Sequence, residues 1–402
     1  MKMKLSEIAF YVEERVNSDT ISLEEYVTTD CILQNKRGRE CATNLPPQSC
    51  SLVCYKKGDV LVANIRPYLK KIWYADIDGA ASSDVLVFRA KDGHSSEFLF
   101  ATLLQDSFYD YVMQGAKGSK MPRGDKEQIM RYEMPTLSVA EESIGKFIMD
   151  INRKIHLNEQ INQNLEKMAK LLYDYWFVQF DFPNEEGKPY KSSGGEMVWN
   201  KELKRYIPIG WHCGNLFEIA VFTNGLACQK FRPKDNEVSL PVIKIREMHD
   251  GISVDTEKVS LNIPDSVKVH NGDVLFSWSA SLEVMLWAYG LGGLNQHIFK
   301  VTSANGFPKS FYYFQLLDYV DVFKKMAEAR KTTMGHITQD HLQQSTIAIP
   351  DNKDIADRFE ERISPIFEQT VKLQEEISNL VKQRDELLPL LMNGPISPLN
   401  CD

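Results

Sequence analysis

The sequence contains one plan twice, with the second copy about 215 residues after the first. Short stretches match in the same order and at nearly the same spacing in both copies. A duplicated chain builds two like domains, so we expect it to hold two like partners or to read two similar sites at a fixed spacing. The matching pairs are Leu-x-Glu-Ile-Ala at 5–9 and 216–220, Gly-Asp-Val-Leu at 58–61 and 272–275, Trp73 and Trp287, Pro135 and Pro350, and Asn-Leu at 164–165 and 379–380.

Each copy ends in a long segment whose seam residues are spaced alternately three and four positions apart. This spacing is the coiled-coil pattern, and each seam would be about 50 Å long. Either pairing direction is topologically possible; we expect an antiparallel pair, related by a pseudo-two-fold axis, with the globules at opposite ends. The first seam comprises Ile144, Ile148, Ile151, Ile155, Asn158, Asn162, Leu165, Ala169, Leu172 and Trp176, and the second comprises Phe359, Ile363, Ile366, Thr370, Leu373, Ile377, Leu380, Arg384, Leu387 and Leu391.

Two amides interrupt the first seam, at Asn158 and Asn162. A buried amide at a seam position costs stability but fixes the register and the partner of a helix. The alternative is that this part of the helix is looser or is bound elsewhere. The sequence leaves both interpretations open.

The length of 402 residues allows two or three domains, each large enough to bury a core. No run of 18 apolar residues occurs and the N-terminus has no apolar signal segment, so we expect no membrane contact and a cytoplasmic location. The net charge is −8, yet residues 1–137 carry 18 Lys and Arg against 19 acids. A nearly neutral globule can still present a basic face, so DNA binding remains open.

The seven cysteines do not suggest a disulfide framework. Cys31, Cys41, Cys50 and Cys54 lie close together in the sequence, which raises the alternative of a zinc site. Their spacing lacks the paired Cys-x₂₋₄-Cys arms of a tetrahedral site, so we expect buried structural thiols and no metal.

The segment after the first helix carries the residues that identify a family. The quoted stretches are 171–183 (Leu-Leu-Tyr-Asp-Tyr-Trp-Phe-Val-Gln-Phe-Asp-Phe-Pro), 187–195 (Gly-Lys-Pro-Tyr-Lys-Ser-Ser-Gly-Gly) and 207–211 (Ile-Pro-x-Gly-Trp). They closely resemble the linker of the DNA-specificity subunit of Type I restriction–modification systems. The resemblance extends to 62–72 (Val-Ala-Asn-Ile-Arg-Pro-Tyr-Leu-Lys-Lys-Ile) and, through the duplicated layout, to essentially the whole chain.

The resemblance implies an α+β fold with two mixed α/β target-recognition globules separated by two long antiparallel coiled-coil helices. Each globule would read one half of a bipartite double-stranded DNA target. The partners would be two methyltransferase subunits and, in the full complex, two restriction subunits, which hold S-adenosylmethionine, ATP and Mg²⁺; this chain would hold no cofactor. The expected divisions are recognition domains at 1–140 and 211–350, spacer helices at 141–180 and 351–402 (the latter with the tail), and a linker at 181–210.

Catalytic motifs of the partner enzymes are missing, which indicates a non-catalytic chain. The only Pro-Pro pair, at 46–47, lacks the flanking residues of an adenine methyltransferase loop, and no stretch matches Gly-x₄-Gly-Lys-Ser/Thr. A nuclease-like Glu-x-Lys occurs at Glu202 and Lys204, but three residues recur by chance. A free-standing restriction or modification enzyme is therefore disfavoured.

The best candidate for DNA contact is the glycine-rich loop 115–124, whose backbone can approach a phosphate and whose side chains supply donors. The alternative is a solvated loop without a ligand. Trp278 and Trp287 could be groove wedges, although core positions are the better interpretation. The predicted DNA-contacting residues are Lys117, Ser119, Lys120 and Arg123 in this loop, Arg330, Lys331 and Thr332 in its counterpart, and secondarily Arg37, Arg39, Arg66, Lys70, Lys230 and Arg232.

The aromatic run near the end of the first helix is a candidate partner-binding surface. Tyr173, Trp176 and Phe177 are residue types that are favoured at interface cores, so we expect them to help bind the methyltransferase. The alternative is a helix end packed on the second helix. A different function also remains open, namely a coiled-coil assembly scaffold whose globules bind protein; failure to bind any duplex would favour it.

Overall fold

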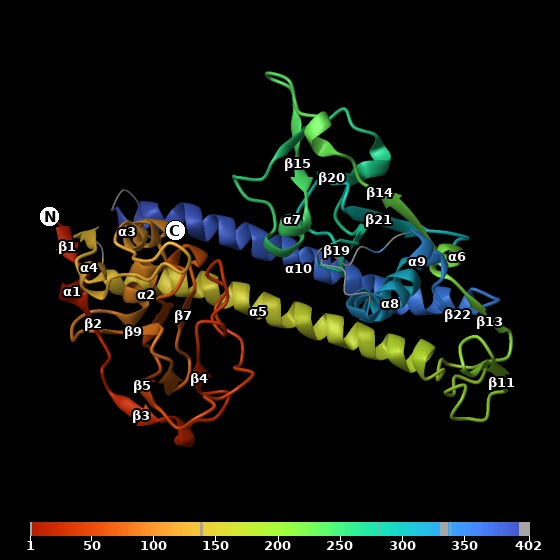
Figure 1. Cartoon of the computed structure of the whole chain (residues 1–402), viewed down its shortest axis with the longest axis horizontal. Helices are drawn as coiled ribbons and strands as arrows, with labels where there is room; N and C mark the ends of the chain where they lie inside the picture. The colour runs from red at the N-terminus through yellow and green to blue at the C-terminus, as the bar shows by residue number, and fades with distance from the viewer. Residues whose placement is uncertain (1, 137–139, 280, 330–336, 338, 394–402) are drawn as a thin grey trace. The chain divides into compact units, whose positions relative to one another are not determined.

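The computed structural model describes residues 2–136, 140–279, 281–329, 337 and 339–393. The chain divides into two compact units, which are coloured along the sequence in Figure 1. The first unit consists of Met1–Leu157 and Asn379–Asp402, and the second consists of Asn158–Ser378. Two long helices, α5 (Glu141–Tyr173) and α10 (Asp354–Met392), contribute one part to each unit.

Both long helices begin with acidic residues, which complement the partial positive charge of a helix N-terminus. Glu141 and Glu142 lie in the first turn of α5, and Asp354 and Asp357 lie in the first turn of α10. After α5 the chain continues as a π-helical turn, η3 (Asp174–Val178). This turn shifts the phase of the side chains that follow it, because each hydrogen bond now spans five residues.

The globule of the first unit contains two four-stranded sheets. The sheet β2-β9-β6-β7 is antiparallel throughout, whereas β4 and β8 are parallel neighbours in the sheet β3-β5-β8-β4. The strands are β1 (Lys2–Lys4), β2 (Ala9–Tyr11), β3 (Arg15–Asn17), β4 (Tyr26–Val27), β5 (Ser51–Tyr55), β6 (Val60–Ala63), β7 (Ile72–Tyr74), β8 (Gly79–Ala81), β9 (Val85–Ala90) and β10 (Glu133–Pro135), and the helices are α1 (Leu5–Ile8), α2 (Ser96–Leu104), α3 (Asp106–Gln114) and α4 (Lys126–Ile129).

The second unit also contains two four-stranded sheets, with orders β14-β21-β18-β19 and β16-β15-β20-β17. The predicted linker 181–210 carries a hairpin, β11-β12, so it is not irregular throughout. The strands are β11 (Met197–Asn200), β12 (Arg205–Pro208), β13 (Trp211–Gly214), β14 (Ala220–Asn224), β15 (Ser239–Ile243), β16 (Lys258–Ser260), β17 (Lys268–Val269), β18 (Val274–Ser277), β19 (Glu283–Leu286), β20 (Gly292–Leu294), β21 (Ile298–Ser303) and β22 (Ile347–Pro350), and the helices are α6 (Leu216–Ile219), α7 (Ile245–Asp250), α8 (Lys309–Ala329) and α9 (Gln339–Gln343).

The two Gly-Asp-Val-Leu stretches adopt the same local structure in their respective units. Gly58 and Gly272 have φ angles of +94° and +83°, a region in which side chains other than glycine are strained. The carboxylates of Asp59 and Asp273 each accept a backbone N–H three residues earlier over 2.8 Å. Each turn leads into an inner strand, β6 or β18, of a sheet whose strand order is the same in both units.

In the first unit, the start of α5 packs against the end of α10. Ile144 and Ile148 are fully buried in one core with Leu388 and Leu391. Farther along the same pair of helices, the buried Arg384 donates through Nη1 to Asn152 Oδ1 over 3.0 Å. The residue order shows that the helices run antiparallel in this unit.

In the second unit, the end of α5 packs against the start of α10. The ring centroids of Tyr173 and Trp176 lie 6.1 and 5.5 Å from that of Phe359. The helix segments in this unit are therefore also antiparallel. Asn158 and Asn162 are 1% and 7% exposed, so both seam amides lie in the interior rather than in solvent.

Of the two tryptophans expected at core positions, one is completely buried and the other is partly buried. Trp287 is 0% exposed and packs in a cluster with Leu275 and Leu294. Trp278 is partly buried and packs against the aromatic core of the second unit. Burial of a large aromatic side chain contributes about 1.5–3 kcal/mol, which favours a structural role for Trp287.

Candidate nucleic-acid interface

The contact loop, residues 115–124, is a narrow turn held by paired backbone hydrogen bonds. Lys117 and Arg123 exchange N–H···O bonds of 2.9 Å in both directions. Gly118, with φ +100°, allows the chain to reverse between them. The loop therefore has a defined conformation, and the side chains of Lys117, Ser119, Lys120 and Arg123 are exposed on it.

Two glycines at the ends of the contact loop allow it to lie close to the domain. A Cβ atom on Gly124 would be 2.8 Å from Val112 Cγ1 and 2.9 Å from Asn64 Oδ1. A Cβ atom on Gly115 would overlap the side chain of Gln128. A side chain at Gly124 would require Val112, Asn64 or the loop to shift, and one at Gly115 would displace the end of the Gln128 side chain, so both glycines allow the loop to lie close to the domain.

The turn between β6 and β7 brings Arg66 to the contact loop. Arg66 N donates to Pro122 O over 2.8 Å, and Gly124 N donates to Asn64 O over 3.2 Å. Arg66 and Lys70 flank the 3-10 turn Pro67–Leu69 (η2) with φ angles of +52° and +50°. The backbone therefore folds over between these two cations.

Acidic neighbours partly neutralise the positive charge of the contact loop. Lys117 Nζ lies 2.9 Å from Asp125 Oδ2, and this hydrogen bond raises the pKa of the Lys117 ammonium above its ordinary value. Arg123 Nη2 lies 3.1 Å from Asp84 Oδ1. Lys120 has no ion-pair partner among the described residues, so it retains its full charge toward solvent.

Lys70 is part of a separate ionic cluster in the first unit. Its Nζ lies 2.9 Å from Asp106 Oδ1, which is also 2.8 Å from the buried Nζ of Lys36. Although desolvation acts in the opposite direction, hydrogen bonds from both lysines keep the pKa of the Asp106 carboxyl below its usual value. Lys36 Nζ additionally lies 3.4 Å from Asp385 of α10. The cluster ties the loop around Lys36 to α3 and α10.

The two predicted arginines near Lys36 have different surroundings. The Arg39 guanidinium lies 4.3 Å from the ring centroid of Trp73 and donates to Glu24 O over 2.8 Å. Arg37 is exposed and donates only a long bond of 3.4 Å to Gln34 O. Arg39 is therefore held in a stacked position, whereas Arg37 is available to a ligand.

The counterpart loop of the second unit, with Arg330, Lys331 and Thr332, lies outside the described residues. The described residue Ile337 donates through its backbone N to Trp278 O over 3.0 Å. Lys230 ends the 3-10 turn Cys228–Lys230 (η4), and both it and Arg232 are exposed. These two cations flank Phe231, which is 39% exposed.

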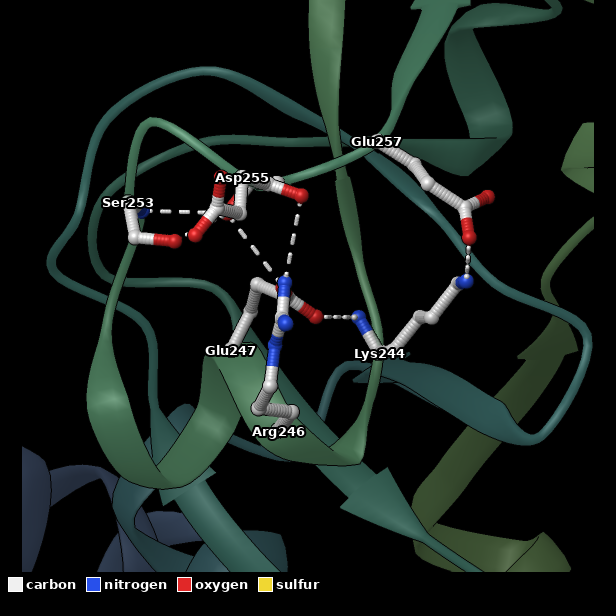
Figure 2. Close-up of polar contacts among 7 residues, drawn as sticks. Lys244, Arg246, Glu247, Ser253, Asp255 and Glu257 are labelled. Atoms are coloured by element: carbon white, nitrogen blue, oxygen red, sulfur yellow. Dashed lines mark hydrogen bonds and ion pairs between the residues drawn. The ribbon is translucent and has the colours of Figure 1, made fainter. Parts of the chain in front are cut away.

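One cationic group that the sequence analysis missed lies just after β15. Arg246 is paired with Glu247, a carboxylate with a side-chain exposure of only 1%. Figure 2 shows Arg246 and Glu247 beside Lys244 and Asp255. The only sequence signal is a glutamate three residues after Lys244, which is the spacing of a helix capping box.

The predicted partner-binding surface is wrong in its choice of side chains. Tyr173, Trp176 and Phe177 are 2–3% exposed and belong to the aromatic core of the second unit. Trp176 and Phe177 lie in the π-helical turn η3, and Tyr173 directly precedes it. A set of exposed apolar residues of α5 and η3, which we call the outer stripe, comprises Ile161, Met168, Leu171, Tyr175 and Val178, with exposures of 37%, 51%, 69%, 38% and 42%.

The prediction of buried structural thiols is correct for Cys31 but wrong for Cys41 and Cys50, which are exposed. The segment that carries them forms a surface loop between β4 and β5. No group of three or more His, Cys, Asp or Glu side chains among the described residues could hold a metal ion. None of the helices that the structure describes is long and apolar enough to cross a membrane.

A cavity of about 510 Å³ in the second unit lies between α10 and the turn before β18. Its polar lining is largely satisfied by the protein itself. Lys309 Nζ donates to Gly272 O over 2.8 Å, and Glu360 Oε2 accepts from Ser310 N over 2.7 Å. The cavity therefore offers few free polar groups to a ligand.

Residues 208–383 match the Type I restriction modification DNA specificity domain. The chain is 25% identical over 373 residues to the specificity subunit of the Type I restriction enzyme MjaIX from Methanocaldococcus jannaschii, covering 90% of this chain and 82% of that protein. It is 24% identical over 464 residues to the HindI specificity subunit from Haemophilus influenzae, covering 98% of each. The crystal structure of the Type I S subunit from M. genitalium has a similar fold, with a TM-score of 0.59, 12% identity and coverage of 98% and 96%.

Proposed function

Because the chain belongs to the family of DNA-specificity subunits of Type I restriction–modification systems, we propose that it selects a bipartite DNA sequence for its complex. Two target-recognition domains, at about 1–140 and 211–350, each bind one half of the target. The observation that supports this most is the contact loop, whose glycine anchors hold exposed cations beside Arg66. Cations of this kind bind the DNA backbone, which fixes the orientation of the domain on the duplex.

The two long helices act as a ruler between the recognition domains. The shared strand orders and the matching Gly-Asp turns support a duplicated plan in which the helices relate two similar domains. Their antiparallel packing inside each unit supports a pseudo-two-fold arrangement. A protein frame of this symmetry reads two half-sites at a fixed spacing, as dimeric DNA-binding proteins do.

The chain recruits two methyltransferase subunits and, in the full complex, two restriction subunits. The outer stripe supports one of these contacts, since exposed apolar residues spaced seven, three, four and three positions apart can accept another helix. We assign a helix of the methyltransferase to this stripe. Methylation and cleavage, with S-adenosylmethionine, ATP and Mg²⁺, belong to the partners, so the chain itself is not an enzyme.

A duplex-selection experiment tests the proposed function. The chain is purified with its methyltransferase subunit, mixed with random duplexes at fixed salt, and the bound fraction is sequenced. We expect two short enriched half-sites separated by a gap of constant length and random sequence. If the complex binds no duplex at any salt concentration, or binds duplexes without enrichment, the chain is an assembly scaffold whose globules bind protein.

A further inference from the structure

The helix α7 of the second unit is anchored by a carboxylate that lies in the protein interior. Glu247 is 1% exposed, and its Oε2 accepts from Lys244 N over 3.2 Å at the start of the helix. Its Oε1 accepts from Thr256 Oγ1 over 3.3 Å and from the guanidinium of Arg246. Both carboxylate oxygens are therefore engaged, and Glu247 has a single defined position.

Arg246 is held by this carboxylate although the two residues are adjacent. Neighbouring side chains on a helix do not normally face each other, so Arg246 must bend back to reach Glu247. Its Nε and Nη2 atoms lie 3.0 and 2.7 Å from Glu247 Oε1. Both residues are labelled in Figure 2. The Arg246 side chain is nevertheless 55% exposed. One edge of the guanidinium is thus fixed by Glu247, whereas the opposite end carries Nη1 and the second hydrogen of Nη2, which has only a long contact of 3.5 Å to Asp255 O.

The only further bond of the guanidinium is weak. Nη2 donates to Asp255 O over 3.5 Å, which is at the limit of hydrogen bonding. Nη1 has no hydrogen-bond partner among the described residues. Lys244, in contrast, has its Nζ at 2.5 Å from Glu257 Oε1. Arg246 is therefore the cation of this cluster that combines a fixed orientation with free donors.

The helix α7 contacts the first residue of β19 in the second unit. His249 of α7 lies 3.2 Å from Glu283 Oε2, at the start of β19. Trp278, which directly follows β18, accepts a hydrogen bond from Ile337 N. Both α7 and Ile337 therefore contact residues that border the connection between β18 and β19.

The first unit has the same arrangement around its own turn. Asn35 N and Lys36 N donate to Leu69 O and Lys70 O over 2.9 and 3.0 Å. The turn between β6 and β7 therefore lies between this segment and the contact loop. The exposed Arg37 follows directly, so in the first unit an arginine-bearing segment and the basic contact loop meet at one turn, and in the second unit the arginine-bearing helix α7 contacts the start of β19.

We propose that Arg246 is a specificity-determining residue that reads a guanine in the half-site bound by the second recognition domain. This inference rests on the proposed function. Two parallel N–H donors of an arginine match the acceptors O6 and N7 of guanine in the major groove. Glu247 binds one edge of the Arg246 guanidinium and leaves the opposite end, with Nη1, to make this contact. Because the side chain is already fixed, little rotamer entropy is lost on binding. Glu247 is a positioning residue that acts through Arg246.

The test is the same duplex selection, made with Arg246→Lys and Arg246→Gln in the full chain with its methyltransferase subunit. We expect preference for one guanine in one half-site to fall about 5- to 150-fold, the range that corresponds to one bidentate contact. The other half-site should keep its sequence, which shows that the variant is folded. Lys244→Gln is the matched control, since it removes one positive charge from the same cluster and should leave all base preferences unchanged.

Glu247→Gln separates positioning from a structural role. For Glu247→Gln we expect a smaller loss of preference at the same guanine than for the Arg246 variants, and no loss at other positions. The melting temperature of Glu247→Gln should be close to that of Glu247→Asp. Unchanged base preferences in both Arg246 variants would overturn the inference while leaving the proposed function intact. A uniform affinity loss across all sequences with a smaller salt slope would also overturn it, because that result identifies a phosphate contact. If the wild type selects no sequence, both proposals fall together.

Discussion

At the scale of single residues, acidic side chains decide which cations remain free to bind. Arg123, Lys117 and Lys70 have carboxylate partners at about 3 Å, whereas Lys120 has none in the described part of the chain. The sequence predicted the contact loop from its glycines and cations. It could not predict Asp84 or Asp106 as partners, because tertiary folding brings them from distant positions. Nor could it show that Arg66 adopts a positive φ angle that turns it toward the loop.

The contact loop should contribute affinity without sequence preference. Replacing Lys117 and Lys120 by Ala is expected to weaken duplex binding equally for all sequences and to reduce the slope of log K against log salt by up to about 2. The measurement is duplex affinity from low to moderate salt. The matched control replaces Lys56 and Lys57, which are exposed at the other end of β6. An unchanged slope in the loop variant would show that the loop does not contact phosphates.

At the scale of elements, the heptads predicted long helices over 141–180 and 351–402, and α5 and α10 lie within these limits. The face taken by the last aromatic residues was not predictable. A continued α-helix places Tyr173 and Phe177 on one face and Trp176 beside it, which leaves their exposure open. The π-helical turn and the aromatic core together bury all three. Neither feature has a local sequence signal.

The seam amide Asn158 should cost stability. Neither Oδ1 nor Nδ2 of this buried side chain has a hydrogen-bond partner among the described residues. Asn158→Leu is therefore expected to stabilise the chain by about 1–3 kcal/mol, seen as a higher midpoint of urea unfolding. Asn164→Leu, at an exposed position of the same helix, serves as the control and should change little. A destabilised Asn158→Leu would show that the amide has a partner in solution and fixes the register.

The outer stripe should bind the methyltransferase. Leu171 is 69% exposed, so Leu171→Asp should leave folding nearly unchanged. Affinity for the methyltransferase subunit should nevertheless fall at least about tenfold, because a carboxylate would be desolvated in an apolar interface. Titration calorimetry measures this affinity. Val254→Asp changes an even more exposed apolar residue elsewhere in the same unit, and this variant should bind normally. Equal affinities for both variants would exclude the stripe from the interface.

At the scale of the whole molecule, the proposed ruler implies that the helices set the distance between the two DNA half-sites, whereas the globules set the sequence of each half-site. One extra heptad in both α5 and α10 lengthens them by about 10 Å, or about three base pairs. We expect the random gap in the selected DNA to grow by this amount while both half-sites stay the same. Duplex selection measures both at once. Altered half-sites, or an unchanged gap, would mean that the helices do not set the spacing.

The duplication in the sequence indicated this plan because it preserved turn residues such as Gly58 and Gly272, which the backbone requires. The side chains that read bases have no such constraint. Arg246 is distinguished only by the buried Glu247, which is visible in the fold and not in the sequence. For that reason the family and the architecture could be predicted from the sequence, whereas the reading residues could not.

The most direct test of sequence selection by this chain is methylome sequencing of cells that carry its gene with the methyltransferase gene, compared with cells lacking only this chain. We predict a bipartite modified motif with a constant gap that appears only when the chain is present. Sequence selection by this chain would be contradicted if cells with expressed and active methyltransferase showed no such motif. The same motif in cells without the chain would contradict it as well.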